Sequence, residues 1–181
     1  MRKIVAGLFI SLDGVVESPD KWHFPYFNDE MGQAVGAGME SADAILLGRR
    51  TYEEFAAVWP HQTDDPGADF MNDTPKLVAT TTLTSADWAN STILTGNLAD
   101  ALAEHKQRSG KNIQVIGSPT LVRSLLREHL LDELELLVHP IVLGTGKRLF
   151  EDVHAQVPLT LVGSATFSTG VVKLTYAPAT G

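Results

Sequence analysis

The 181-residue chain contains no cysteine. Disulfide bonds, a thiolate nucleophile and cysteine-based zinc or iron–sulfur sites are therefore excluded, and this composition fits a cytoplasmic protein. The six histidines show neither an H-E-x-x-H motif nor another metal-ligand spacing. We therefore expect no metal site.

Positive charge is also scarce, because 14 Lys and Arg face 22 Asp and Glu, which gives a net charge of −8. Binding to nucleic acid or to an anionic membrane requires a basic face, so we expect neither partner. No apolar run approaches the ~20 residues that span a bilayer, and the start of the chain shows no signal-peptide core. The length and the 44% apolar content predict one globular domain over residues 1–181.

Several common catalytic motifs are missing as well. The chain has no G-x-G-x-x-G dinucleotide fingerprint and no G-x-S-x-G nucleophile elbow. Gly146-Lys147 fails as a phosphate-binding P-loop, since Arg148 stands where Ser or Thr is required. In a chain without such a nucleophile or a metal, chemistry would have to come from a bound cofactor.

A short apolar run followed by a helix start is the most informative feature that is present. Ala44–Leu47 is continuously apolar, which predicts a strand covered on both faces. Gly48 follows, and Thr51 with Glu54 forms a capping box that predicts a helix over Thr51–Val58.

Two arginines stand at this junction. Arg49 and Arg50 bring two permanent positive charges close to the positive end of the helix dipole. Free N–H groups, a dipole and two guanidinium groups favour a phosphate or pyrophosphate. The alternative is an ordinary connection with two solvated arginines.

A second loop has the same design. Asn112–Ile116 predicts a strand, Ser118 is a good N-cap, and Pro119 suits the first helical position. Gly117 lies at this second junction between a strand and a helix. If the two strands are parallel neighbours, both loops emerge at the edge of the sheet where open α/β folds bind ligands.

The rest of the chain alternates strands and helices before an antiparallel end, which predicts a mixed sheet with helices on both faces. Expected strands are Ile4–Ile10, Lys76–Thr80, Thr92–Leu94 and Glu133–Val142; expected helices are Asp29–Glu40 and Leu98–Ser109; Val15–Asn28 is expected to be irregular, His61–Thr74 a surface loop, and Leu159–Phe167 with Val171–Tyr176 a hairpin.

Five segments in this order resemble the RibD C-terminal domain family of the dihydrofolate reductase-like superfamily. They are SLDG at Ser11–Gly14, LLGRRTYE at Leu46–Glu53, KLVATTTL at Lys76–Leu83, IQVIGSPTLV at Ile113–Val122 and DELELLVHPIVLGTGKRLF at Asp132–Phe150. The resemblance implies a three-layer dihydrofolate reductase-like α/β fold, with a mixed, mostly parallel sheet and an antiparallel C-terminal hairpin. It also implies NADPH-dependent hydride transfer to a small pyrimidine- or pterin-like heterocycle. The best-defined family reaction reduces 5-amino-6-(5-phosphoribosylamino)uracil in riboflavin biosynthesis.

The resemblance assigns cofactor contacts to three groups of residues. They are Gly48, Arg49, Arg50 and Thr51; Thr80, Thr81 and Thr82; and Gly117, Ser118, Pro119, Thr120 and Leu121. Arginine beside the adenine ribose favours NADP over NAD, for which an acidic residue is expected. Related proteins usually carry Gly-Gly-Pro at the second loop, so Ser118 departs from the family pattern.

The substrate side is assigned less directly. Asp13 and Asp29 are the candidate acids, but Asp13 also suits a turn and Asp29 also suits the first turn of a helix. Candidate substrate contacts are Trp22, Phe27, Gly144, Thr145 and Gly146, for which the alternatives are core packing and a strand bulge.

A second class of function stays open at this point. The chain would then be a non-catalytic protein that binds NADP(H) or another phosphorylated metabolite and acts through partner contacts. The strand over Leu134–Val142 and the C-terminal hairpin suggest a homodimer interface, since an exposed sheet edge otherwise invites aggregation.

Overall fold

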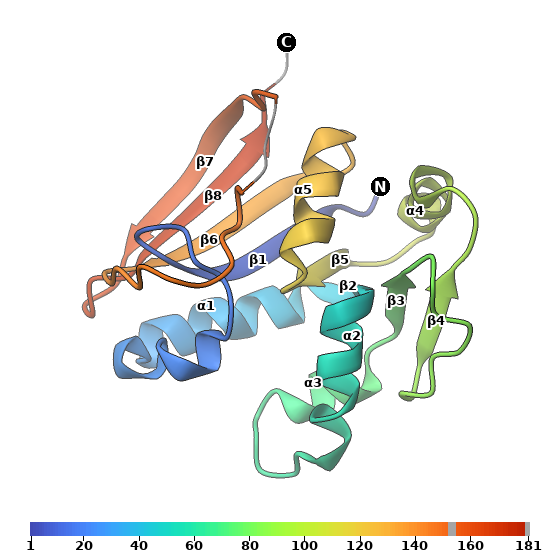
Figure 1. Cartoon of the computed structure of the whole chain (residues 1–181), viewed down its shortest axis with the longest axis horizontal. Coiled ribbons are helices and arrows are strands. Elements are labelled where there is room, and N and C mark those ends of the chain that lie inside the picture. Colours follow the sequence, from blue (N-terminus) through green and yellow to red (C-terminus); the bar gives the residue numbers. More distant parts are fainter. Residues whose placement is uncertain (152–154, 180–181) are drawn as a thin grey trace.

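One eight-stranded sheet organises the chain (Figure 1). The computed structural model describes residues 1–151 and 155–179. The strands are β1 (Ile4–Ser11), β2 (Ala42–Gly48), β3 (Lys76–Ala79), β4 (Ser91–Leu94), β5 (Asn112–Ile116), β6 (Glu133–His139), β7 (Leu159–Thr166) and β8 (Val172–Pro178). Their order is β4-β3-β2-β5-β1-β6-β8-β7, and β8 alone runs in the direction opposite to the other strands.

Helices cover both faces of this sheet. They are α1 (Asp29–Glu40), α2 (Arg49–Ala56), α3 (Ala68–Asp73), α4 (Leu98–Gln107) and α5 (Pro119–Arg127). Leu102 of α4 and Leu125 of α5 join one core with Leu46 of β2, whereas Tyr52 of α2 and Met71 of α3 pack on Ile45 at the other face. Helix α1 covers Leu137 of β6 on that second face. The result is the three-layer α/β arrangement that the sequence predicts.

The burial of each strand follows from its position in the sheet. On β2, Ile45 and Leu46 point to opposite cores and are both fully buried, as expected for a central parallel strand. On β7, an edge strand, no residue is fully buried. The expected strand and helix order is confirmed, including Asp29–Glu40 as a helix and the antiparallel end.

Several expected boundaries are wrong. Helix α2 begins at Arg49 rather than Thr51, so Gly48 is its N-cap and the predicted capping box does not form. Glu54 instead lies 3.5 Å from the Nε atom of Arg50. Strand β6 ends at His139, because the ring of Pro140 leaves no N–H for the ladder.

Two segments that were expected to be irregular contain short helices. The expected loop over His61–Thr74 contains α3, because Ala68 and Met71 are buried against the core. The aromatic segment before α1 contains two 3-10 turns, Pro19–Lys21 and Phe24–Tyr26, and a third covers Trp59–His61. These turns are too short to give a periodic pattern.

Parallel pairing brings the ends of β1, β2, β3, β5 and β6 to one edge of the sheet. The loops that carry the predicted cofactor and substrate residues therefore emerge together. Among the described residues, no helix is long and apolar enough to cross a membrane.

Candidate functional site

The two predicted anion loops touch each other. The backbone N–H of Gly48 donates a hydrogen bond to Oγ of Ser118 at 3.0 Å. A Cβ at Gly48 would lie 3.4 Å from that hydroxyl, and a Cβ at Gly117 would lie 3.2 Å from Cγ2 of Thr51. The tight approach is at Gly117, which has a positive φ, whereas a side chain at Gly48 would make ordinary contact with Ser118.

The backbone at the second loop is left-handed over two residues. Gly117 has φ +58°, and Ser118 has φ 57° and ψ 56°. A residue with a Cβ pays about 1–2 kcal/mol for this conformation, and Ser118 is buried in it. Ser118 stands at the N-cap of α5, as predicted, but its hydroxyl makes no capping bond. Pro119 occupies the first turn, as predicted.

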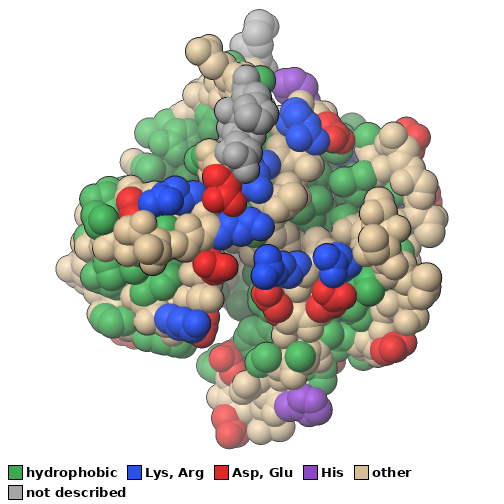
Figure 2. Space-filling model, in the orientation of Figure 1, with side chains coloured by type: hydrophobic (Ala, Val, Ile, Leu, Met, Phe, Trp, Pro, Cys, Tyr) green, Lys and Arg blue, Asp and Glu red, His purple; other side chains and the backbone are tan. Residues whose placement is uncertain are grey.

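The two arginines lie in the first turn of α2. Nη1 of Arg49 donates to Glu53 at 2.9 Å, and Nε of Arg50 lies 3.5 Å from Glu54. All four side chains are exposed, and such surface pairs contribute only a few tenths of a kcal/mol. In Figure 2, basic side chains gather near the middle of one face, with acidic ones beside most of them.

The predicted ribose-side threonines form a turn after β3. Oγ1 of Thr80 accepts hydrogen bonds from the N–H groups of Thr82 and Leu83, both at 3.1 Å. Thr81 and Thr82 are exposed. Because β3 pairs with β2, this turn leaves the sheet at the same edge as Gly48.

The side chain of Asp13 connects the turn after β1 to the loop after β6. Its carboxylate accepts hydrogen bonds from Oγ of Ser11 at 2.6 Å and from the N–H groups of Leu143 at 3.1 Å and Gly144 at 2.8 Å. These bonds, that of Ser11 foremost, hold the pKa of Asp13 well below its usual value. The guanidinium of Arg148 lies 3.6 Å away and donates to the carbonyl of Asp13. These contacts therefore favour the ionised carboxylate of Asp13 near neutral pH.

The loop of Gly144, Thr145 and Gly146 is exposed and follows β6. Gly144 and Gly146 have φ values of +77° and +116°. A Cβ at Gly146 would lie 2.6 Å from Val15, so this glycine allows the loop to approach the turn after β1. The loop is not a bulge within a strand, because β6 has already ended.

At the start of α1, the neighbour of the predicted acid makes the contacts. Asp29 is exposed, and Asn28 caps the helix by accepting from the N–H of Met31. Oε2 of Glu30 accepts from N–H and Oγ of Ser168 at 2.7 and 2.6 Å, and these bonds lower the pKa of Glu30. Glu30 thus fixes the C-terminal hairpin to α1, a contact that the sequence pattern did not indicate.

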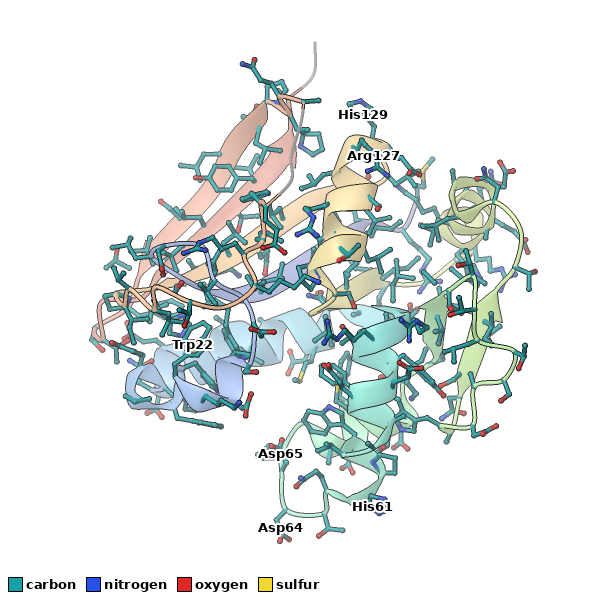
Figure 3. All side chains as sticks on the ribbon, in the orientation of Figure 1. Trp22, His61, Asp64, Asp65, Arg127 and His129 are labelled. Atoms are coloured by element: carbon teal, nitrogen blue, oxygen red, sulfur yellow. The ribbon has the colours of Figure 1, made fainter. Side chains whose placement is uncertain are left out.

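The two predicted substrate aromatics differ in exposure. Trp22 is 8% exposed, and its indole N–H donates to the carbonyl of Glu17 at 3.0 Å. Figure 3 places Trp22 beside α1, whereas His61 and Asp64 point away from the body of the molecule. Phe27 is 51% exposed and lies against Gly32. Of these two aromatic side chains, only Phe27 is exposed enough to contact a ligand directly.

Two histidines that sequence reasoning did not select lie behind this aromatic segment. His23 stacks on Phe9 with ring centroids 4.6 Å apart, and His139 meets Trp22 edge-on at 5.1 Å. Burial lowers the pKa of both imidazoles. The six histidines show no spacing that singles out these two, since the pair forms only in the folded chain.

Among the described residues, no cluster of three or more His, Asp or Glu side chains is placed to hold a metal ion. An open hollow of about 340 Å³ lies between β4 and α4, lined by Thr92, Asn97 and His105 among others. It does not include the paired loops.

Solved structures define the class of this fold. A putative riboflavin biosynthesis protein from Shewanella sp. PV-4 superposes with a TM-score of 0.80 at 23% identity, covering 98% of this chain and 99% of that one. Dihydrofolate reductase from Enterococcus faecalis, complexed with NADP(H) and RAB-propyl, gives 0.63 at 16% identity over 98% and 97% of the chains. The protein therefore has a dihydrofolate reductase-like fold.

The family is also clear. The model of the RibD C-terminal domain matches residues 2–173, so the chain belongs to the RibD C-terminal domain family. The uncharacterized protein YyaP of Bacillus subtilis (strain 168) is 29% identical over 97% of this chain and 94% of that protein. RibD of Acinetobacter baumannii is 17% identical with a TM-score of 0.68, and the chain spans 59% of it. The chain thus has a reductase-type fold.

Proposed function

We propose that this protein is an NADPH-dependent oxidoreductase that reduces a small heterocyclic substrate of the pyrimidine or pterin kind. The observation that carries the proposal is the contact between the two strand-end loops, through Gly48 with Ser118 and Gly117 with Thr51. Two helices begin at these loops, and their first N–H groups lack partners within the helices. A doubly phosphorylated ligand suits this pair of helix starts better than a single phosphate.

The residues present fit NADPH. Gly48 and Gly117 would let the pyrophosphate approach the backbone, and Thr120 and Leu121 would offer N–H groups at the start of α5. Arg49 or Arg50 would exchange its weak surface pair with a glutamate for a stronger bond to the ribose phosphate. Thr80, Thr81 and Thr82 would line the ribose side. When bound, NADPH supplies the hydride.

The substrate would meet the same edge of the sheet from the side of β1 and β6. We assign Asp13 a positioning role there, because its carboxylate holds Gly144 and stays ionised. Asp29 remains the proposed proton carrier, since it is exposed at the start of α1. Phe27, Thr145 and the flanking glycines would contact the substrate, whereas buried Trp22 would support this wall from behind.

Nucleotide binding provides the first test. We expect NADPH to bind more tightly than NADH, in a titration read by thermal shift and by protein fluorescence. Arg49→Ala and Arg50→Ala should together weaken NADPH binding by about tenfold or more and leave NADH binding nearly unchanged, because only NADPH carries the ribose phosphate.

A matched control is available on α4. Arg108 is exposed and pairs with Glu104 four residues earlier at 2.6 Å, as the arginines of α2 pair with glutamates. Arg108→Ala should leave both affinities unchanged. If neither nucleotide binds the wild type, the reductase proposal fails and a binding module for another phosphorylated metabolite takes its place.

Turnover separates the enzyme from a non-catalytic NADP(H)-binding protein. The absorbance of NADPH should fall in the presence of a reducible pyrimidine ribotide or pterin. Tight NADPH binding without consumption of any such compound would favour the non-catalytic alternative. The joined loops support nucleotide binding, and the family supports reduction.

A further inference from the structure

Ser118 stands between the two strand-end loops, and its hydroxyl serves the helix that it does not begin. As the N-cap of α5, a serine normally accepts a hydrogen bond from an N–H group of its own helix. Here the hydroxyl makes no such bond and accepts instead from the backbone N–H of Gly48, the N-cap of α2, at 3.0 Å. One side chain therefore lies at the N-terminal ends of two helices.

The proton of this hydroxyl has no good acceptor. A serine hydroxyl can donate one hydrogen bond while it accepts another. Among the described residues, its acceptor is the carbonyl of Ile116 at 3.5 Å, whereas a normal O–H···O bond measures about 2.5–3.0 Å. Ser118 is only 6% exposed, so solvent has little access to it. The hydroxyl is thus a buried donor whose capacity is nearly unused.

The backbone of Ser118 is a second, separate sign. Its φ of 57° and ψ of 56° are left-handed, a conformation that glycine adopts freely and serine does not. Residues held in such conformations gather at functional sites, where the surrounding structure keeps them in place. Glycine would relieve the strain at this position, and it would lack the hydroxyl. The side chain is therefore the reason to look for a role here.

The next residue takes a donor away from the same place. Pro119 lies in the first turn of α5 and has no N–H group. The start of a helix binds anions through its first N–H groups, so one of these donors is missing in α5. The hydroxyl of Ser118 stands directly before this gap and can supply an O–H instead. Across the contact, Arg49 and Arg50 follow Gly48 and add positive charge.

The bond from Gly48 also selects the kind of acceptor. A hydroxyl that accepts a hydrogen bond becomes a stronger donor, because successive hydrogen bonds polarise one another. Bonds to an ionised acceptor are shorter and about twice as strong as bonds to a neutral one. A phosphate oxygen would therefore complete the chain from the Gly48 N–H through the Ser118 O–H better than a neutral carbonyl does.

We propose that the hydroxyl of Ser118 donates a hydrogen bond to the diphosphate of a bound dinucleotide and relays the N–H of Gly48 to that anion. This inference rests on the proposed function and adds a specificity-determining residue to it. Ser118 recognises the diphosphate, whereas Arg49 and Arg50 recognise the separate ribose phosphate. The two kinds of phosphate are thus read by different side chains.

Calorimetric titration with three ligands tests this division. Ser118→Gly should weaken the binding of NADPH and of inorganic pyrophosphate by the same factor, about tenfold, because one hydrogen bond to a charged acceptor is lost. It should leave adenosine 2′-monophosphate unchanged, since that ligand carries a ribose phosphate and no diphosphate. Arg49→Ala with Arg50→Ala should do the reverse, weakening adenosine 2′-monophosphate and sparing pyrophosphate.

A second variant separates recognition from stability. Ser118→Ala keeps the backbone strain that Ser118→Gly relieves, so the two variants differ in stability but both lack the hydroxyl. We expect them to lose the same factor in affinity for pyrophosphate. Ser41→Ala is the control, because it removes a hydroxyl that donates to the carbonyl of Gly38 at 2.8 Å at the far end of α1. It should leave all three affinities unchanged.

The outcomes distinguish this inference from the function on which it rests. If the wild type binds neither NADPH nor pyrophosphate, both are overturned. If the wild type binds NADPH and the Ser118 variants bind it as tightly or more tightly, the role of the hydroxyl is overturned and the proposed function stands. A loss of adenosine 2′-monophosphate equal to that of pyrophosphate would also overturn it, because Ser118 would then act only by holding the loops.

Discussion

Single buried polar side chains decide much of the behaviour of this protein. His23 is 8% exposed and His139 is fully buried, and within residues 1–151 and 155–179 neither Nδ1 of His23 nor Nε2 of His139 has a hydrogen-bond partner. Nδ1 of His139 bonds instead to the carbonyl of Leu137 at 2.8 Å. Around them lie Phe9, Trp22 and Tyr26, which offer no ion partner. The fold therefore favours neutral imidazoles.

This preference predicts acid sensitivity. A histidine whose pKa is lowered in the folded state stabilises the protein fully above its unfolded pKa of about 6.5, and that contribution is lost as the pH falls from there toward the folded pKa. Asp20 opposes the shift of His23 only weakly. We expect the urea midpoint of the wild type to fall between pH 7.5 and pH 5.

His23→Phe should reduce this fall, since a phenyl ring keeps the stack on Phe9 and cannot take up a proton. His61→Phe is the matched control, because His61 is exposed. Urea unfolding of the three proteins at both pH values checks the prediction. An equal acid response in all three would contradict it.

Lys76 shows what a residue pattern cannot reveal. This lysine opens β3 and is fully buried, and its Nζ donates to the carbonyls of Met71, Asn72 and Thr74 at 2.8–3.0 Å. It also lies 4.4 Å from the ring centre of Trp88, and burial lowers its pKa to about 8. In the sequence it is one lysine before an apolar run, so its role depends on the helix that folds back over it.

At the scale of elements, the junctions between strands and helices were predictable in place but not in detail. The glycines at positions 48 and 117 and the proline at position 119 mark both helix starts. The predicted capping role of Thr51 was wrong, because Gly48 is the N-cap of α2. Ser118 is the N-cap of α5 as predicted, but its hydroxyl accepts from the N–H of Gly48 on the opposite loop instead of capping the helix. Local propensity cannot weigh such contacts, which join residues about 70 positions apart.

The hydroxyl of Ser118 therefore carries a prediction for the second loop. Ser118→Ala should destabilise the fold by roughly 1–2 kcal/mol, because the N–H of Gly48 loses its acceptor while the left-handed strain remains. Ser118→Gly loses the same bond but relieves about 1 kcal/mol of strain. Chemical denaturation should thus rank the wild type and Ser118→Gly above Ser118→Ala. An alanine variant as stable as the glycine variant would contradict this account.

At the scale of the whole molecule, the sequence predicted where the strands lie along the chain, that the C-terminal part is antiparallel, and the family. Apolar runs with β-branched residues give the central strands, and the glycine-containing turn at Ser168–Gly170 gives the hairpin. The short helix α3 was missed, since six residues with two apolar contacts give no period. The hydrogen bonds of Asp13 with the backbone of Leu143 and Gly144 were missed because they join distant segments of the chain.

The sheet leaves one long edge exposed. Strand β7 pairs only with β8, and Leu161 and Val162 on it are 50% and 56% exposed. We propose that a second copy of the chain covers this edge. Light scattering after size exclusion should give twice the mass of one chain, and Leu161→Lys should give a monomer. Val58→Lys, at an equally exposed position after α2, should remain a dimer. A monomeric wild type would contradict the proposal.

The place of β1 has a consequence for synthesis. Strand β1 is synthesised before both of its neighbours, β5 and β6, because Ile4 pairs with Ile113 and Ser11 pairs with His139. More than a hundred residues must therefore be made before β1 has either neighbour, and β8 enters the sheet later still. During that interval the apolar strand β1 has no partner strand. The nascent chain can therefore misassemble or aggregate unless this strand is kept from contact with other chains. Slower translation between β1 and β6 lengthens that interval, which makes the yield of folded protein sensitive to the speed at which this stretch is translated.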